Sequence, residues 1–411
     1  MTDFREELKA SAEKVREKPA LLGPDIDIDK FSSKPAYVEM ISSPDKLTGQ
    51  VAEKAHQVGI NSDENKRSGT FFQYDHTPIL ACQKKGIKGV EVLSTPEAIE
   101  QYDWLKDYYW KAVAVDMDKY TARTETNLTG GYFIRANEGV KLSMPVQACL
   151  FIGTAGLLQA VHNIIIAEEK SELHIITGCT THPLVLSGMH IGISEFYVKR
   201  GATITFTMIH GWAEDVEVRP RTGAIIEEGG TFISNYICFK PVKSIQMYPT
   251  SYLMGKNSRV RYHTLLYGCD NSLLDVGSRA VLKAEGTRAE MTARAIARDS
   301  TQIIARGHLV GEKAETKAHL DCRGLLLSDK AKIHSIPELE AKAEGCDLSH
   351  EAAVGKIEEA QLCYLMSRGL NEDEATALIV RGFLDPEVPG LPEHLKQEVR
   401  RTIELTSEKM M

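Results

Sequence analysis

The chain has 411 residues, of which 43% are hydrophobic, and a formal net charge of −8 at pH 7. This composition can bury a large core over two or three domains, which excludes a disordered or fibrous protein. The negative charge and the absence of a basic stripe in the sequence argue against binding to nucleic acid.

The first third of the chain, residues 1–129, predicts a mixture of helices and strands. A charged helix is expected near the N-terminus, and a second helical piece begins near Ser43. The aromatic segment 95–113 predicts a third helix, with Thr95 as its N-cap and Glu97 in its first turn. Its tryptophans and tyrosines are expected to pack in a core rather than to stack on bases, because no arginine or lysine stripe accompanies them.

Short β-rich runs recur from residue 130 to residue 339, separated by turns that contain glycine, asparagine or charged residues. No helical pattern lies between them, which argues against a doubly wound α/β sheet and leaves a sandwich, a barrel or a solenoid. The phrases at Lys199, Glu228 and Glu285 each place a polar turn with glycine before a new strand. Stacked rungs of a β-helix show this pattern, although no strict repeat period is visible.

One stretch of this region, residues 146–167, carries no charge and could be mistaken for a membrane span. Polar residues interrupt it and the turn 153–156 divides it, so we predict two buried strands and no membrane helix. Eight cysteines are scattered along the chain rather than paired at framework spacing, and no secretory leader precedes them. Reduced thiols and a cytoplasmic location are therefore expected.

The C-terminal segment, residues 340–411, predicts a helical region. Apolar residues recur at three- and four-residue steps over 357–368 and 372–382, and Asn371 and Glu374 are placed as a capping box. A third helix is expected after the PEVPG loop.

Soft and intermediate metal ligands gather before these helices, where Cys322, His334, Cys346, His350 and Glu351 fall within 30 residues. Thiolates suit iron-sulfur clusters, zinc and copper(I), whereas imidazole and carboxylate complete a shell that must later open. Zinc is the main competitor from spacing alone, but no second CxxC or HxxxH completes a tetrahedral set nearby. The same residues also fit a buried core cysteine and a solvated His-Glu pair. Cys363 lies on the apolar face of a predicted helix and is expected to be a core residue.

The run SHEAAVGKI, followed by EEAQLCYLMSRGLNEDEATALIVRGF, resembles the signature end of the SufB/SufD family, the scaffold subunits of the SUF iron-sulfur assembly machinery. The likeness continues upstream through CRGLLLSDKAKIHSIPELE and covers Gly130 to Phe383. It implies a right-handed parallel β-helix core flanked by helical segments. It also implies a scaffold without catalytic turnover, which holds a transient iron-sulfur cluster.

Residue by residue, the resemblance places Cys322 on the family's cluster-linked cysteine, Glu351 on its carboxylate, and His350 on the histidine implicated in the SufD partner. In bacterial members two different chains present these groups, whereas this sequence contains all three. We therefore expect a homodimer with the cluster at its twofold interface, or a heterodimer with a SufD-like chain. Cys346 is a further candidate ligand in this variant.

The resemblance also implies partners. A SufC-like ABC ATPase is expected to grip the C-terminal helices, between Ile357 and Leu384, because the chain has neither a Walker-type nucleotide loop nor a dinucleotide fingerprint of its own. A sulfur donor and acceptor apoproteins are the other expected partners.

Cys179 resembles the SufB cysteine proposed to receive sulfur and pass it through the β-helix interior. Next along that path, Trp212 matches a family tryptophan, His210 stands where a glutamine is common, and Arg221 replaces a lysine. A thiolate must be activated by nearby positive charge to accept persulfide sulfur, and Arg221 or a histidine would supply it. An arginine and an asparagine that SufB subunits carry one rung earlier are absent here.

Two other function classes compete with the scaffold. A zinc-stabilised structural protein would use Cys322, Cys346 and His350. A β-helix carbohydrate-active enzyme would need paired carboxylates along one rung face, but the acidic residues Glu227, Glu228, Asp215 and Glu217 are expected in turns.

Overall fold

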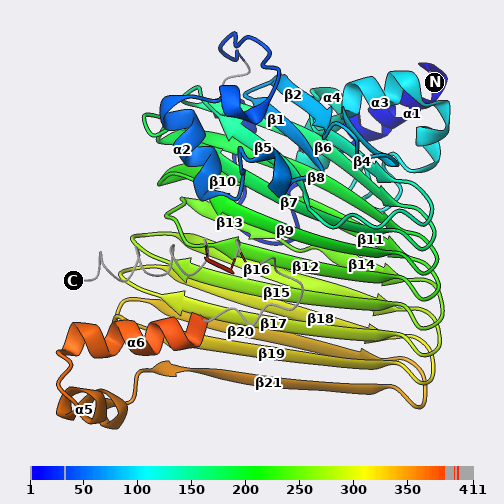
Figure 1. Cartoon of the computed structure of the whole chain (residues 1–411). Helices are drawn as coiled ribbons and strands as arrows, with labels where there is room; N and C mark the ends of the chain where they lie inside the picture. The colour runs from blue at the N-terminus through cyan, green and yellow to red at the C-terminus, as the bar shows by residue number, and fades with distance from the viewer. Residues whose placement is uncertain (1, 32–33, 385–392, 394–395, 398–411) are drawn as a thin grey trace.

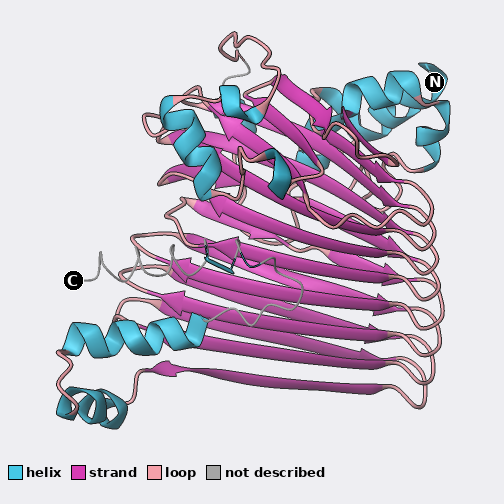
Figure 2. Cartoon of the chain, in the orientation of Figure 1, coloured by secondary structure: helices cyan, strands magenta, loops and turns pink. Residues whose placement is uncertain are grey.

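The protein, represented by a computed structural model, is a stacked parallel β-solenoid with helices at both ends of the chain (Figure 1). The structure describes residues 2–31, 34–384, 393 and 396–397, so the predicted third C-terminal helix lies almost entirely outside the described residues. Each turn of the solenoid contributes strands to two facing sheets, which gives a mainly β architecture (Figure 2). The predicted β-helix fold is thereby confirmed.

Two sheets, called sheet 1 and sheet 2, contain the strands of the described residues. Sheet 1 has ten strands, in the order β2 (Thr77–Gln83), β1 (Gly69–Tyr74), β5 (Val146–Ile152), β7 (Glu172–Thr181), β9 (Thr203–Gly211), β12 (Thr231–Cys238), β15 (Arg259–Gly268), β17 (Arg288–Ala297), β19 (Lys317–Leu326) and β21 (Asp347–Lys356). Sheet 2 has eleven, which in chain order are β3 (Val90–Ser94), β4 (Tyr132–Ala136), β6 (Leu157–Ala167), β8 (Ser187–Val198), β10 (Asp215–Val218), β11 (Arg221–Ile226), β13 (Ser244–Met247), β14 (Thr250–Leu253), β16 (Leu273–Leu282), β18 (Gln302–Gly311) and β20 (Lys332–Ala341).

The strand register shows the sequence repeat of the solenoid, because paired residues in successive turns lie a nearly constant number of positions apart. The row through Arg259, Arg288 and Lys317 advances 29 residues at each step. One corner of the solenoid holds a residue with positive φ in each turn, namely Gly139, Lys170, Gly201, Gly229, Asn257, Gly286, Glu315 and Gly345. Three of these eight are not glycine, although glycine adopts this conformation most easily. The period is therefore hidden from a search for repeated glycines.

Helices cover the outer faces of both sheets. The helices are α1 (Thr2–Glu13), α2 (Gly49–Gln57), α3 (Thr95–Gln101), α4 (Lys119–Thr126), α5 (Glu359–Ser367) and α6 (Glu372–Leu384), with short 3-10 helices at Ile28–Lys30, Pro44–Lys46, Glu64–Lys66 and Asp103–Asp107. Helices α3 and α4 pack on sheet 2, and α1 packs on α4. Helix α2 packs on sheet 1 near its N-terminal end, and residues of α6 join the same outer apolar cluster near its other end. None of the described helices is long and apolar enough to cross a membrane.

The two ends of the solenoid differ. At the first end, β2 and β3 pair antiparallel with their neighbours, β1 and β4. At the other end, β21 pairs only with β19 and β20 only with β18 within the described residues, so each sheet finishes in a ten-residue strand with one unpaired edge. Figure 1 shows β21 as the lower edge of the stack. Bare edges of this length invite pairing with another chain.

Several local predictions are confirmed. Residues 146–167 form two buried strands, β5 and β6. The capping box of α6 is present, with the Asn371 N–H donating to Glu374 at 2.8 Å and the Glu374 N–H donating to the Asn371 side chain at 2.9 Å.

The predicted helix over 95–113 is wrong in its cap and its length. Ser94, not Thr95, is the N-cap, and α3 ends at Gln101. Tertiary contacts override the helical pattern beyond it, because the fully buried Glu195 carboxylate accepts hydrogen bonds from the backbone N–H groups of Trp110 and Ala112 at 2.7 and 2.6 Å. Helix α4 was not predicted.

The solenoid also extends beyond the predicted boundaries of the core, residues 130–339. Strands β1 to β3 join the two sheets from the N-terminal region, and β21 continues sheet 1 to Lys356. The segment that contains Cys346, His350 and Glu351 is therefore the last rung of the solenoid rather than part of a helical region.

Candidate functional site

Cys322 lies inside the solenoid, one rung before its open end. It belongs to the apolar cluster between the two sheets together with Leu320, and its exposed fraction is 3%. Burial raises the pKa of the Cys322 thiol, and the hydroxyl of Ser335, in β20 of the facing sheet, opposes that rise. The Ser335 hydroxyl is buried and has no hydrogen-bond partner other than this thiol. The structure thus places a buried thiol beside a buried hydroxyl near the open end of the interior.

His350 shares the inner face of sheet 1 with Cys322. Strand β21 is in register with β19, so that Ala352 is paired with Cys322 and His350 with Leu320. Leu348 packs against the interior cluster, and side chains alternate between the two faces of a strand, so His350 points the same way. One strand spacing and a two-residue offset separate the backbones of Cys322 and His350 by about 8 Å. His350 is exposed because no strand follows β21 in the described chain.

Glu351 lies on the opposite face of the sheet from Cys322. It is paired with Asp321, and adjacent residues of a strand necessarily point to opposite faces. Asp321 accepts a hydrogen bond from Arg294 at 2.7 Å, whereas Glu351 is exposed. The structure therefore brings together two of the three predicted ligands, Cys322 and His350, and leaves Glu351 at the outer rim of the same edge.

Cys346 lies in the turn before β21, away from Cys322. Its thiol donates to the carbonyl oxygens of Gly311 and Lys313 at 3.5 and 3.3 Å. It precedes Ala352, the partner of Cys322, by six residues, which is about 20 Å along a strand. The zinc set of Cys322, Cys346 and His350 is therefore not assembled within one chain. Throughout the described part of the chain, no three metal-binding side chains come close enough to hold an ion.

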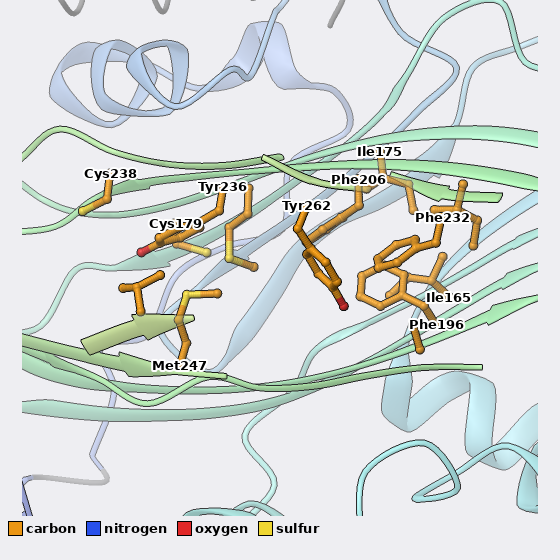
Figure 3. Packing of buried hydrophobic residues seen from close by; sticks show 14 of the residues in the cluster. Ile165, Ile175, Cys179, Phe196, Phe206, Phe232, Tyr236, Cys238, Met247 and Tyr262 are labelled. Carbon is orange, nitrogen blue, oxygen red and sulfur yellow. The ribbon is translucent and has the colours of Figure 1, made fainter. Parts of the chain in front are cut away.

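A second group of predicted residues lies deeper in the interior, and Figure 3 shows Cys179 there between the two sheets with Tyr236 and Cys238. His210 is paired with Cys179 in the neighbouring strand. Its Nδ1 lies 2.9 Å from the Tyr236 hydroxyl, and its ring lies 5.4 Å from that of Trp212. Burial raises the pKa of the Cys179 thiol and lowers the pKa of His210 well below its usual value. Three of the four residues of the predicted sulfur path thus share one interior cluster.

Arg221 is the residue that the structure separates from this cluster. Its side chain is buried on the outer face of sheet 2, where Nε lies 2.7 Å from Asp118 and the guanidinium covers the ring of Tyr120 in α4. The predicted role of Arg221 as the activating charge for Cys179 is not supported, because strand alternation directs it outwards. No cation contributes to the pKa of Cys179.

We expect Arg221→Ala to destabilise the fold by about 3–5 kcal/mol, because Asp118 is left as an uncompensated buried charge. The measurement is denaturant unfolding monitored by circular dichroism. Arg200→Ala is the matched control, since the ion pair with Glu169 is exposed and its loss costs about 0–1 kcal/mol. Equal stability of the two variants would contradict the anchoring role.

Helix α5 exposes apolar side chains. None of its residues is buried, and Tyr364 and Met366 are 59% and 42% exposed. The prediction that Cys363 is a core residue is wrong, because it is exposed on this helix. The helix itself was predicted correctly, but no element in the described part of the chain covers the apolar face of α5.

Sequence reasoning missed two interior residues of this region, Ser335 and Cys238. Neither lies in a recognisable motif. The two facing sheets bring Ser335 beside Cys322, and strand pairing places Cys238 in the row of Cys179 and His210. The only available signal was the hidden repeat, which would have aligned Cys238 with His210 at a spacing of 28 residues.

Comparisons with known proteins identify the family. Residues 150–383 match the family model described as "SUF system FeS cluster assembly, SufBD core domain". An iron-sulfur cluster assembly SufBD family protein of Methanothermobacter thermautotrophicus is 50% identical over 408 residues, which cover 98% of this chain and 99% of the relative. A protein with the same description from Archaeoglobus fulgidus is 50% identical over 87% of this chain and 96% of its own. One from Staphylococcus saprophyticus is 28% identical over 89% of this chain and 79% of its own.

Proposed function

Because this chain belongs to the SufBD family of the SUF iron-sulfur cluster assembly system, we propose that it is a scaffold on which clusters are assembled and from which they are released. The supporting observation is the position of Cys322 and His350 on one inner face, at the end of the solenoid where the last strand of each sheet has one unpaired edge. One thiolate and one imidazole hold iron with fewer bonds than the four thiolates of a permanent cluster. The assembled cluster can therefore be released by breaking few bonds between the protein and iron.

The open edge also supplies the partner surface. We infer that β21 meets β21 of a second copy across a twofold axis, so that two thiols and two imidazoles converge. This arrangement explains why one protomer presents an incomplete ligand set. The exposed Glu351 carboxylate at the rim of the same edge offers hard oxygen ligands to incoming iron.

Sulfide for the cluster would arrive through the interior. Cys179 lies five strand spacings from Cys322, a distance of about 24 Å. We propose that Cys179 receives persulfide sulfur and that His210 and Trp212 line the first part of its route. Histidine, rather than Arg221, is the polar group beside that thiol.

Energy for opening the dimer would come from a SufC-like ATPase docked on α5 and α6. The exposed apolar face of α5 fits this role, because uncovered apolar helix faces mark protein contacts. Nucleotide-driven movement of two such ATPases would separate the paired edges.

Charge on the exposed face of α5 should prevent this docking. We expect Tyr364→Asp combined with Met366→Asp to weaken ATPase binding about tenfold or more, because two apolar contacts become buried charges. Copurification and calorimetric titration with the ATPase measure the effect. Ser367→Asp, on the same helix, is the matched control, and undiminished binding by the double variant would refute this placement.

Anaerobic reconstitution with iron and sulfide distinguishes the scaffold from the other classes. Broad absorption at roughly 400 nm with iron and sulfide bound supports thiolate-ligated cluster. Colourless protein that retains zinc would favour the zinc-stabilised structural protein, and protein without metal would favour the carbohydrate-active enzyme.

A further inference from the structure

The interior of the solenoid contains a third thiol, Cys238, in addition to those of Cys179 and Cys322. It is 1% exposed and belongs to the cluster between the two sheets. The register pairs Cys179 with His210, and His210 with Cys238, in three successive strands. The two thiols therefore lie in one inward row, with the imidazole of His210 between them.

The surroundings of this row contain polar atoms that the fold leaves unused. Nε2 of His210 and Nε1 of Trp212 are buried without a hydrogen-bond partner, although buried polar atoms are usually paired. Tyr236 contacts Nδ1 of His210 at 2.9 Å, and its pKa is raised, first by burial and then by Cys238. His190 adds a second imidazole, whose ring lies 5.0 Å from Trp212. A purely structural core would be expected to satisfy or omit these groups.

We propose that Cys238 accepts sulfane sulfur from Cys179, with His210 carrying the proton between the two thiols. The proposal rests on the proposed function, because it requires that Cys179 holds a persulfide. It adds a second sulfur-carrying residue and an acid-base residue to the interior route.

The transfer is balanced without an oxidant or a reductant. The Cys238 sulfur attacks the outer sulfur of the Cys179 persulfide, one S–S bond forms, and the original S–S bond breaks. Cys238 becomes the persulfide and Cys179 returns to the thiol. The proton that leaves Cys238 passes to Nε2 of His210 and from there to the departing Cys179 sulfur.

Burial explains why a proton carrier is needed. It raises the pKa of Cys238 to about 12, and the pKa of Cys179 is also raised. Burial makes the charged thiolate form of either cysteine unfavourable in this interior. The thiol proton of Cys238 must therefore leave as its sulfur attacks the persulfide. Burial lowers the pKa of His210 and keeps it neutral, so its unpartnered Nε2 holds the proton only while passing it on to the Cys179 sulfur.

The distance suits a persulfide but not a direct disulfide. Two strand spacings put the Cα atoms of Cys179 and Cys238 about 10 Å apart, beyond the span of about 7 Å that a disulfide tolerates. The additional sulfur atom of a persulfide extends this reach to about 9 Å, so transfer requires the two side chains to turn toward each other past His210. A direct disulfide between the two cysteines is thus out of reach, whereas a persulfide nearly spans the gap.

The test follows sulfur on individual cysteines of the full-length protein. Wild type and variants are incubated with glutathione persulfide, quenched in acid, alkylated and mapped by mass spectrometry for one added sulfur atom. In the wild type we expect added sulfur on Cys179 first and on Cys238 later. In Cys179→Ala, Cys238 should lose its label, and His210→Gln should slow its labelling about tenfold or more while Cys179 is still labelled.

Cys149 is the matched control, because it is equally buried in the neighbouring strand but belongs to the outer cluster of sheet 1. It should stay unlabelled. Labelled Cys179 with unlabelled Cys238, or Cys238 labelling that persists in Cys179→Ala, overturns the relay and leaves the scaffold function intact. Failure of Cys179 itself to take up sulfur in wild type overturns the proposed interior route and the relay with it. Thermal unfolding of each variant establishes that the fold is retained.

Discussion

Cys322→Ala should abolish assembly of the iron-sulfur cluster on this chain. Cys322 is the thiol at the inner face of the open end and the only thiolate among the three proposed ligands, so its loss leaves only imidazole and carboxylate groups to hold the sulfide-bridged iron. We expect absorption at roughly 400 nm, bound iron and bound sulfide to fall to background in anaerobic reconstitution. The fold should be preserved, because alanine fills most of the space beside Ala293 and Ala352, its partners in the adjacent strands.

Two other thiols serve as controls for this result. Cys363→Ala removes an exposed thiol on α5, and Cys346→Ala removes the turn thiol that lies about 20 Å away along the strand. Both variants should retain cluster. Undiminished iron and sulfide in Cys322→Ala would contradict the assignment of the site, and loss only in Cys346→Ala would move the site to the turn.

Lysines on the open edge should convert the protein to a monomer without cluster. Lysine on an edge strand blocks pairing with another chain, because the charge cannot be buried between two strands. The variant is Ala353→Lys with Val354→Lys, whose parent residues are exposed at the edge of β21. We expect the mass measured by light scattering to halve, and reconstituted cluster to fall about tenfold or more, since each protomer keeps only part of the ligand set.

Leu184→Lys is the matched control for the edge variant. Leu184 is a large apolar side chain with 79% exposure that lies outside β21, so its replacement adds an exposed lysine without touching the edge. It should remain dimeric and assemble cluster. A dimeric edge variant with full cluster content would show that the copies meet elsewhere.

Much of the fold could be predicted from sequence because its signals are local. The short β-rich runs became strands, the division of 146–167 became β5 and β6, and Asn371 with Glu374 formed the expected capping box. The resemblance supplied the β-helix and the family, both of which the structure and the comparisons confirm.

The geometry of the site could not be predicted in the same way, because it depends on which residues face inwards. His350 and Glu351 are adjacent in sequence and were treated as one group, yet β21 directs them to opposite faces. Arg221 looked like a member of the sulfur path until α4, which was not predicted, supplied Asp118 as its partner. Cys238 gave no signal because its neighbours in the interior row are 28 or more residues away in sequence.

The most direct test of the account is the iron and sulfide content of reconstituted full-length protein across a size-exclusion separation with light scattering. A cluster completed by two edges predicts that iron and sulfide elute with the dimer, at one cluster for every two chains, and that the monomer fraction is free of both. Cluster bound to a particle with the mass of one chain would contradict the proposal that two copies form the site.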